Sequence, residues 1–262
     1  MDFFLTKTSK VNLSYRWINS HQEGTLVFIN ALGTDFRIWD EVVKNLQAHF
    51  NILLFDKQGH GLSSLKASTD KLSDYVADLI ELLDFLKIDR CHVVGLSVGG
   101  MIAQLMAHHH PDRIDKLILC DTRHQIGDAT SWNSRIEQVK QGGVAIVAEA
   151  VLQRWFSKEF QLAQPEIVNE VRTMLERCNS EGYIQTCKAI RDADLTDLAK
   201  AINHQTLCIV GSEDKSTLPD AVKDLHQLIA GSQFEIMQGS GHLPCVDNPM
   251  LLSSLILDFI RP

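Results

Sequence analysis

The 262-residue sequence lacks any apolar run close to the roughly 18 residues of a membrane-spanning helix. Its first ten residues, MDFFLTKTSK, contain no basic segment followed by an apolar core of about 7–15 residues, so we expect no secretory signal. No two cysteines have the CxxC spacing of a metal or redox site, and the six are spread along the chain. We therefore expect a cytoplasmic protein without a membrane partner, whose thiols are reduced and mostly buried.

The sequence also has fewer basic than acidic residues. The sequence has 25 Lys and Arg against 33 Asp and Glu, which gives a formal net charge of −8. A field of that sign repels a phosphate backbone and an anionic membrane surface, so nucleic acid is not expected as a partner. An anionic small substrate would need a local cation to offset that field. The apolar share of 45% and the charged share of 22% are otherwise those of a globular domain.

Short apolar runs recur along the chain and alternate with helical patterns. The runs are rich in Val, Ile, Leu and Phe without intervening polar residues, which is typical of strands buried on both faces of a parallel sheet. They comprise Leu26–Ile29, Ile52–Phe55, Val93–Val94, Leu117–Cys120, Leu207–Val210 and Phe234–Met237. Apolar residues at helical spacing lie between several of them, in 72–86 and 98–105. Residues 2–8 and 11–18 alternate polar and apolar side chains, which predicts an antiparallel hairpin at the sheet edge.

The alternation of strands and helices stops near Thr122. Helical patterns without intervening strands follow, around Ser134–Lys140, Val144–Trp155, Ile167–Cys178 and Ile184–Ile190. An insertion of this kind is tolerated where a core connection is exposed. We therefore predict an α/β core of residues 1–122 and 194–262, built on a mostly parallel eight-stranded sheet flanked by helices. Residues 123–193 are predicted to form a helical cap.

The sharpest motif is Gly95-Leu96-Ser97-Val98-Gly99, which lies between a predicted strand and a predicted helix. A nucleophile elbow needs a strand, a tight turn with small neighbours and a helix in that order, because the turn projects the serine oxygen above the sheet edge. This segment supplies all three. Ser97 is therefore the candidate nucleophile. The structural alternative is a glycine-rich packing turn with an incidental serine.

A serine hydroxyl needs a base, and the base needs an orienting carboxylate. His242 is the candidate base, because its glycine-rich loop directly follows the last predicted strand, at the edge where such sheets place their chemistry. Asp214 is the preferred acid, in the loop after the preceding predicted strand. Glu213 lies one residue earlier, and Asp121, at the end of another strand, is a structurally plausible rival.

A tetrahedral intermediate carries a negative charge that preorganised backbone donors stabilise, each by about 10²–10³ in rate. The amide of Val98, directly after the nucleophile at a helix N-terminus, is one predicted donor. The turn Asn30-Ala31-Leu32-Gly33 follows another predicted strand, and the amide of Leu32 is the second. Leu32 and Val98 thus form the predicted oxyanion hole.

Two histidine-containing motifs receive a structural interpretation. Three consecutive histidines, at 108–110, precede Pro111, but neighbours on a helix point in different directions, so a solvated helix end explains them better than a metal site. His60 belongs to the turn 56–61 after a predicted strand, which favours a structural turn near the site over a role as the base.

These residues, together with several further motifs, resemble the 3-oxoadipate enol-lactonases of the α/β-hydrolase superfamily over nearly the whole chain. The motifs are Asn30-Ala31-Leu32-Gly33-Thr34-Asp35 with Trp39-Asp40, GLSVGGMIAQ from Gly95, Arg154-Trp155-Phe156 and Arg191-Asp192-Ala193-Asp194-Leu195. The sequence departs from the family pattern at Gln58, where arginine is usual, and at Val98, where methionine is common. The first change is expected to cost a local ion pair, and the second leaves the backbone donor in place.

The resemblance implies an α/β-hydrolase fold and the hydrolysis of 3-oxoadipate enol-lactone to 3-oxoadipate, in the β-ketoadipate pathway of aromatic catabolism. Ser97 would attack the lactone carbonyl while His242 takes its proton, and the Leu32 and Val98 amides would hold the oxyanion. An enol leaves, water releases the acyl group from the enzyme, and the enol tautomerises. The reaction requires no cofactor and no metal.

The carboxylate arm of such a substrate calls for a cation, because the overall charge of the protein is negative. An arginine meets a carboxylate best, through its planar fork of donors. Arg135 and Arg154 are the candidates in the cap. The resemblance favours Trp132 with Arg135, three residues apart on one helical face. The structural alternatives are a solvated arginine and a core tryptophan.

Two other functions stay open. A carboxylesterase or a C–C bond hydrolase would use the same triad, and fold analogy does not separate either from a lactonase. A small-molecule receptor would keep the scaffold and the pocket but turn over very slowly. Haloalkane dehalogenases and epoxide hydrolases are disfavoured, because those relatives attack with a carboxylate where this chain has Ser97.

Overall fold

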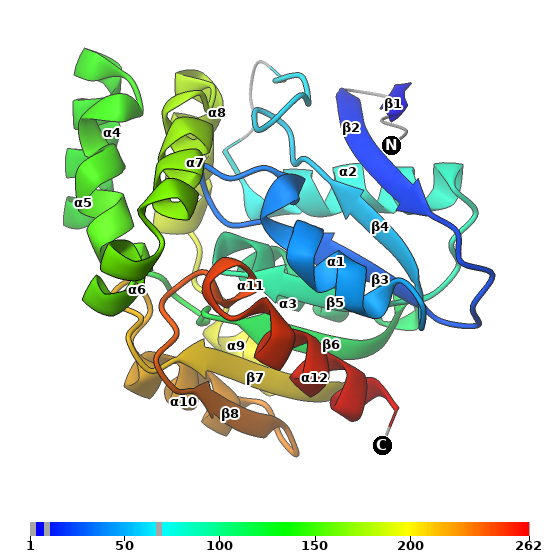
Figure 1. Cartoon of the computed structure of the whole chain (residues 1–262). Coiled ribbons are helices and arrows are strands. Elements are labelled where there is room, and N and C mark those ends of the chain that lie inside the picture. Colours follow the sequence, from blue (N-terminus) through cyan, green and yellow to red (C-terminus); the bar gives the residue numbers. More distant parts are fainter. Residues whose placement is uncertain (1–3, 8–10, 67–69, 262) are drawn as a thin grey trace.

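An eight-stranded sheet forms the centre of the computed structural model, which describes residues 4–7, 11–66 and 70–261. The strands among these residues are β1 (Phe4–Lys7), β2 (Asn12–Ile18), β3 (Thr25–Ile29), β4 (Asn51–Phe55), β5 (Cys91–Leu96), β6 (Ile114–Cys120), β7 (Gln205–Gly211) and β8 (Gln233–Met237). Their order across the sheet is β1-β2-β4-β3-β5-β6-β7-β8 (Figure 1). β2 pairs antiparallel with β1 and β4, and the strands from β3 to β8 run parallel.

This sheet confirms the prediction of a mostly parallel, eight-stranded core with an antiparallel hairpin at one edge. Residues 2, 3 and 8 of the predicted hairpin lie outside the described residues. The central strands are buried on both faces because the connections between parallel strands place helices over each side. Fully buried residues of these strands include Leu26, Val27, Phe28, Leu53, Val93, Val94, Leu117 and Cys208.

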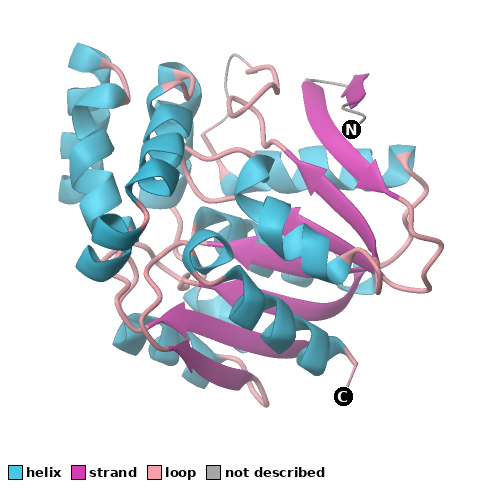
Figure 2. Cartoon of the chain, in the orientation of Figure 1, coloured by secondary structure: helices cyan, strands magenta, loops and turns pink. Residues whose placement is uncertain are grey.

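Helices cover both faces of the sheet (Figures 1 and 2). One face carries α1 (Asp40–Leu46) and α12 (Pro249–Ile260), which pack against each other. The other face carries the remaining core helices, α2 (Leu72–Phe85), α3 (Val98–His109), α9 (Thr196–Lys200) and α10 (Pro219–Leu228). Shorter turns of helix are η1 (Phe36–Trp39), η2 (Pro111–Arg113) and α11 (Pro244–Asp247). Within the described ranges, no helix combines the length and the apolar character that crossing a membrane requires.

The strand order creates a crevice at the carboxyl ends of β3 and β5. From β3 the chain passes to β4 on one side, and it then returns to β5 on the other side of β3. Loops that leave two adjacent parallel strands in opposite directions open a ligand-binding crevice between them. The loop after β3 contains Leu32, and the turn after β5 contains Ser97.

Residues 123–195 contain helices and no strand, and all of them are described. The helices are α4 (Ala129–Gly142), α5 (Ala145–Trp155), α6 (Lys158–Ala163), α7 (Pro165–Glu176) and α8 (Ser180–Arg191). We call these five the cap helices. They stand together beyond the end of the sheet toward which the arrows of β5 and β7 point (Figure 1). They therefore cover the edge at which the crevice opens.

Three of the cap helices differ from the sequence-based expectation, and α8 is one of them, since it begins at Ser180 rather than near Ile184. α4 begins several residues before the predicted Ser134, because the side chain of Asp128 caps it by accepting the Ser131 N–H at 3.0 Å. α6 was not predicted, since its six residues, KEFQLA, are too few to show an apolar period. Its N-terminus is capped by Ser157, which accepts the Phe160 N–H.

The predicted strand Phe234–Met237 is present as part of β8, but it is not buried on both faces. β8 is an edge strand that pairs with β7 alone, and Ile236 is 42% exposed. An apolar run does not reveal whether a strand has one neighbour or two, because that depends on the order of strands in the sheet.

All six cysteines are free and buried, as predicted. Burial raises the pKa of the Cys91 and Cys208 thiols to about 12, so both thiols are protonated at neutral pH. Neither is activated as a nucleophile.

Candidate active site

Ser97 occupies the turn between β5 and α3 with a strained backbone. Its φ of 58° and ψ of −119° lie outside the regions that non-glycine residues favour. The turn requires small neighbours, since a Cβ added at Gly99 would lie 2.2 Å from the carbonyl oxygen of Ile29. The Ser97 N–H donates to the Cys120 carbonyl at 3.0 Å, which fixes the turn to the adjacent strand. This is the geometry of a nucleophile elbow.

His242 lies in the loop after β8, and the end of α5 holds it in place. The His242 N–H donates to the Trp155 carbonyl at 2.7 Å. A Cβ added at Gly241 would lie 2.1 Å from the same oxygen, so only glycine permits this close approach. The Trp155 ring stacks on the imidazole with a centroid distance of 6.3 Å. The cap thus fixes the position of a core residue.

Asp214 forms a hydrogen bond with the imidazole of His242. His242 Nδ1 lies 2.8 Å from Asp214 Oδ2, and the Thr217 hydroxyl donates to the same oxygen at 2.6 Å. The Ser216 and Thr217 N–H groups donate to Oδ1 at 2.7 and 3.1 Å. Burial opposes the charge on Asp214, but the neighbouring imidazole and these donors outweigh it and lower the pKa of the carboxyl. An ionised Asp214 accepts the Nδ1–H, which leaves Nε2 of His242 as the basic nitrogen.

Asp121 lies beside this pair but does not replace Asp214. It is fully buried, and its Oδ1 accepts the Gly211 N–H at 2.9 Å. Burial and the nearby charge of Asp214 raise the pKa of Asp121 well above its usual value, which favours the protonated form of this carboxyl. Glu213, the other alternative, is exposed. Of the three acids considered from the sequence, Asp214 is the one bonded to His242.

Asp121, Asp214 and His242 also satisfy the spacing of a metal site. One ligand atom from each residue lies within 4.8 Å of the others. A metal would compete with the existing bond between His242 Nδ1 and Asp214, and the raised pKa of Asp121 makes that carboxyl a poorer ligand. The donor set therefore suits the hydrogen-bonded pair of Asp214 and His242 better than a metal.

Ser97 and His242 open into a common cavity of about 220 Å³. Leu32 lines the same cavity, and Val98, next to Ser97, is the first residue of α3. An N–H at the start of a helix has no carbonyl of a preceding turn to bond, so the Val98 amide is available to a ligand. The other residues that line the cavity are Ile126, Gly127, Ser131, Trp132, Arg135, Arg154, Trp155, Tyr183, Ile190, Lys215, Ser216 and Thr217.

The three cap residues singled out from the sequence, Trp132, Arg135 and Arg154, all line this cavity. The Arg135 guanidinium lies 4.9 Å from the centroid of the Trp132 ring, whose Nε1 donates to the Ile126 carbonyl at 2.6 Å. Within the part of the chain that the structure describes, neither arginine forms an ion pair. Burial and the charge of Arg135 lower the pKa of Arg154. The two guanidinium groups are therefore close enough to repel each other.

Several polar residues of the cavity were missed from the sequence, among them Lys215 and Tyr183. Lys215 follows Asp214 directly, so its position in the same loop was a usable signal. Tyr183 lies on α8 among buried apolar residues, and nothing in its local sequence distinguishes it from a core tyrosine. Both add hydrogen-bond donors to the wall that holds the two arginines.

The motifs that carried the family resemblance join the loops around the cavity. Trp39 Nε1 donates to the side chain of Asn30 at 2.9 Å, and the Asn30 amide donates to the Phe55 carbonyl at 3.0 Å. Arg191 on α8 donates to Asn133 on α4 at 2.7 Å, which joins two cap helices. Asn30, Trp39 and Arg191 therefore fix the loops and cap helices around the cavity without lining it themselves.

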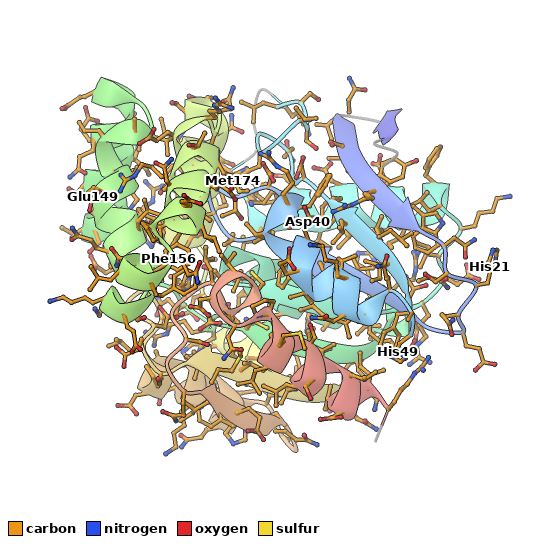
Figure 3. The ribbon with its side chains drawn as sticks, viewed as in Figure 1. His21, Asp40, His49, Glu149, Phe156 and Met174 are labelled. Atoms are coloured by element: carbon orange, nitrogen blue, oxygen red, sulfur yellow. The ribbon has the colours of Figure 1, made fainter. Side chains whose placement is uncertain are left out.

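A sulfur contact joins the cap helices to the core. The Asp35 N–H donates to Met174 Sδ at 3.4 Å, and Figure 3 shows Met174 on α7 at the boundary between cap and core. Phe156 lies at the foot of α5 in the same view, next to the Trp155 carbonyl that holds His242. At Gln58, the departure from the family pattern, the amide donates to Asp78 at 2.6 Å in place of an ion pair.

The chain belongs to the alpha/beta hydrolase fold family, whose model matches residues 24–249. It is 30% identical to 3-oxoadipate enol-lactonase 2 of Acinetobacter baylyi over 94% of this chain and 92% of that one, and 28% identical to 3-oxoadipate enol-lactonase 1 of the same species over 90% and 88%. Its structure resembles that of the enol-lactonase of Burkholderia xenovorans LB400, with a TM-score of 0.95 and 30% identity over 99% of this chain and 100% of that chain. The predicted fold class and family resemblance are confirmed.

Proposed function

We propose that this protein hydrolyses 3-oxoadipate enol-lactone to 3-oxoadipate, an ester hydrolysis of aromatic catabolism, through an acyl-enzyme on Ser97. The main support is one arrangement: a serine on an elbow and an imidazole bonded to a buried carboxylate open into the same small cavity, which two unpaired arginines also line. The similarity to enol-lactonases over most of the chain supports the same substrate. In this proposal residues 123–193 act as a substrate-binding cap over a core of 1–122 and 194–262.

In the first half of the reaction, Ser97 Oγ attacks the lactone carbonyl carbon while His242 Nε2 takes the hydroxyl proton. The Leu32 and Val98 amides hold the resulting oxyanion, and each such donor contributes about 10²–10³ in rate. Collapse of the intermediate breaks the ring C–O bond, and the protonated His242 returns its proton to the departing enol oxygen. Ring opening leaves the acyl group and the enol in one molecule, which remains bound to Ser97 as an ester.

In the second half, His242 takes a proton from a water molecule that attacks the ester of Ser97. The tetrahedral intermediate expels the serine oxygen, which recovers its proton from His242. The released enol tautomerises to the 3-oxo diacid. An enol is a better leaving group than an ordinary alkoxide, so the proposed substrate makes the first half easier than a simple alkyl ester would.

Arg135 and Arg154 give the cavity a local positive charge in a protein of net charge −8. In our proposal Arg135 binds the carboxymethyl arm of the lactone beside the Trp132 ring, and Arg154 strengthens the same field. Charge-assisted bonds from a guanidinium to a carboxylate are among the strongest in proteins. The cavity is small, which favours a compact substrate over a long acyl chain.

A substrate panel tests the proposed function. The purified protein should be offered the enol-lactone, p-nitrophenyl acetate and a ring-cleavage dienone, and kcat/KM compared. We expect the lactone to be hydrolysed with the highest kcat/KM. A higher value for the ester would make the protein a carboxylesterase, and a higher value for the dienone would make it a C–C bond hydrolase.

Replacement of the proposed carboxylate-binding arginine should act on binding. Arg135→Ala is expected to raise KM for the anionic lactone about 10-fold or more, because a charge-assisted bond is lost, and to change KM for the neutral ester less than about threefold. Arg172→Ala is the matched control, since Arg172 also lies in the cap but pairs with Glu149 outside the cavity. Equal effects of Arg135→Ala on both substrates would exclude its proposed role.

A further inference from the structure

Lys57, in the turn after β4, is a buried lysine that the proposed reaction does not use. It is only 2% exposed, and its Nζ donates to the Ala31 carbonyl at 2.6 Å, with the Asn30 carbonyl at 3.5 Å. Within the described ranges of the chain it forms no ion pair. Burial of an ammonium group without a carboxylate partner is costly, so a side chain retained there calls for a specific interaction.

The carbonyl that receives this bond belongs to the peptide group that contains the Leu32 N–H. A peptide group is planar and conjugated, so a donor at its oxygen draws electrons from the nitrogen and strengthens the N–H as a donor. The hydroxyl and the N–H of Thr34 point to the same oxygen, at 3.0 and 3.4 Å. Lys57 adds a donor, charged when protonated, to a carbonyl that already has two neutral ones.

We propose that Lys57 is a positioning residue of the oxyanion hole: its hydrogen bond to the Ala31 carbonyl orients the Ala31–Leu32 peptide and polarises its N–H toward the negative charge that forms on the substrate. This inference rests on the proposed function, in which the Leu32 amide is one of two oxyanion donors. Lys57 lies behind the peptide and does not line the cavity, so it acts only through Leu32.

The charge on Lys57 depends on pH in the neutral range. Burial lowers the pKa of Lys57 to about 7, against the opposing effects of Cys178 in the cap, Asp56 directly before it and Asp35 in the loop after β3. His60, the other titratable group nearby, stays neutral because burial and the charge of Lys57 lower its pKa well below the usual value. The ammonium is therefore present below about pH 7 and is lost as the pH rises through that value. The polarisation of the Leu32 N–H should weaken over the same interval.

The first test is kinetic and uses p-nitrophenyl acetate, an activated ester whose cleavage by a serine nucleophile also passes through an oxyanion. Lys57→Met keeps the volume and removes the donor, and it should lower kcat about 10- to 100-fold, since loss of a whole oxyanion donor costs about 10²–10³. KM should change less than about threefold, and the decline of kcat above pH 7 should disappear. Lys116→Met is the matched control: Lys116 also donates to backbone carbonyls, those of Phe259 and Ile260, but far from the cavity, and its loss should leave kcat unchanged.

The second test is spectroscopic. It uses the wild-type protein, so it depends neither on catalysis nor on the folding of a variant. In protein labelled with ¹⁵N-leucine, the Leu32 amide resonance of the wild type should shift with a midpoint near pH 7. A wild-type resonance that stays constant between pH 6 and 8 overturns the proposal, as does a Lys57→Met protein with unchanged kcat. If the enol-lactone is not hydrolysed while Lys57→Met still loses kcat on the ester, the proposed function fails and this inference stands.

Discussion

Ser97→Ala is expected to lower kcat about 10⁴-fold or more while substrate binding is largely retained. The hydroxyl oxygen of Ser97 forms the covalent bond to the acyl group. Its removal leaves only the oxyanion donors and the binding contacts. The strained turn at φ 58° tolerates alanine as it tolerates serine, because neither side chain is branched at Cβ. The loss should therefore reflect chemistry rather than unfolding.

The variant should be compared with the wild type by initial rates on the lactone and by equilibrium binding of the product. Ser254→Ala is a suitable control, since Ser254 lies exposed on α12 and its hydroxyl donates to Asp258 on the same helix. If the wild type turns over no faster than Ser97→Ala, the protein is better described as a small-molecule receptor on a hydrolase scaffold.

The second large effect is expected at Asp214. Asp214→Asn should lower kcat about 10⁴-fold, because an amide facing His242 Nδ1 stabilises the wrong tautomer and removes the charge that supports the imidazolium. Asp121→Asn should lower kcat less than about tenfold. Burial and the charge of Asp214 raise the pKa of Asp121 and so favour its neutral form, and an amide oxygen at this position can still accept the Gly211 N–H.

The two asparagine variants are matched controls for each other, because each replaces a buried carboxyl near the same imidazole. Their rates should be measured from pH 5 to 9, with folding checked by circular dichroism. A loss at Asp121→Asn as large as that at Asp214→Asn would mean that the neutral acid is also required. A small loss at Asp214→Asn would mean that Asp214 does not orient His242.

The elbow and the sheet could be predicted because their causes are local. A turn of Gly95, Ser97 and Gly99 between an apolar strand and a helix has few other conformations available, and the parallel strands follow from apolar runs separated by helices. Loops after parallel strands meet at one edge of the sheet, so the proximity of His242 to the Ser97 turn also followed from chain order. None of these inferences needed a detailed contact.

The rest depended on contacts between distant segments. The sequence left Asp121 as a rival of Asp214, and only the turn that aims Asp214 at His242 separates them. The Trp155 carbonyl that holds the His242 loop comes from the cap, which no local pattern connects to that loop. Lys57 looked like part of a structural turn, because its proximity to the Ala31 carbonyl arises from the packing of two neighbouring loops.

The central claim is that Ser97 is the nucleophile that His242 activates. Diethyl p-nitrophenyl phosphate tests it directly, since an activated serine displaces p-nitrophenolate and keeps the phosphoryl group. After trypsin digestion, mass spectrometry should find the label on the peptide of residues 91–113, whose one serine is Ser97. Labelling should be stoichiometric, accompany the loss of hydrolysis, and be absent from His242→Ala. Full inactivation with the label on any other residue, or rapid hydrolysis by a protein that never reacts, would contradict the account.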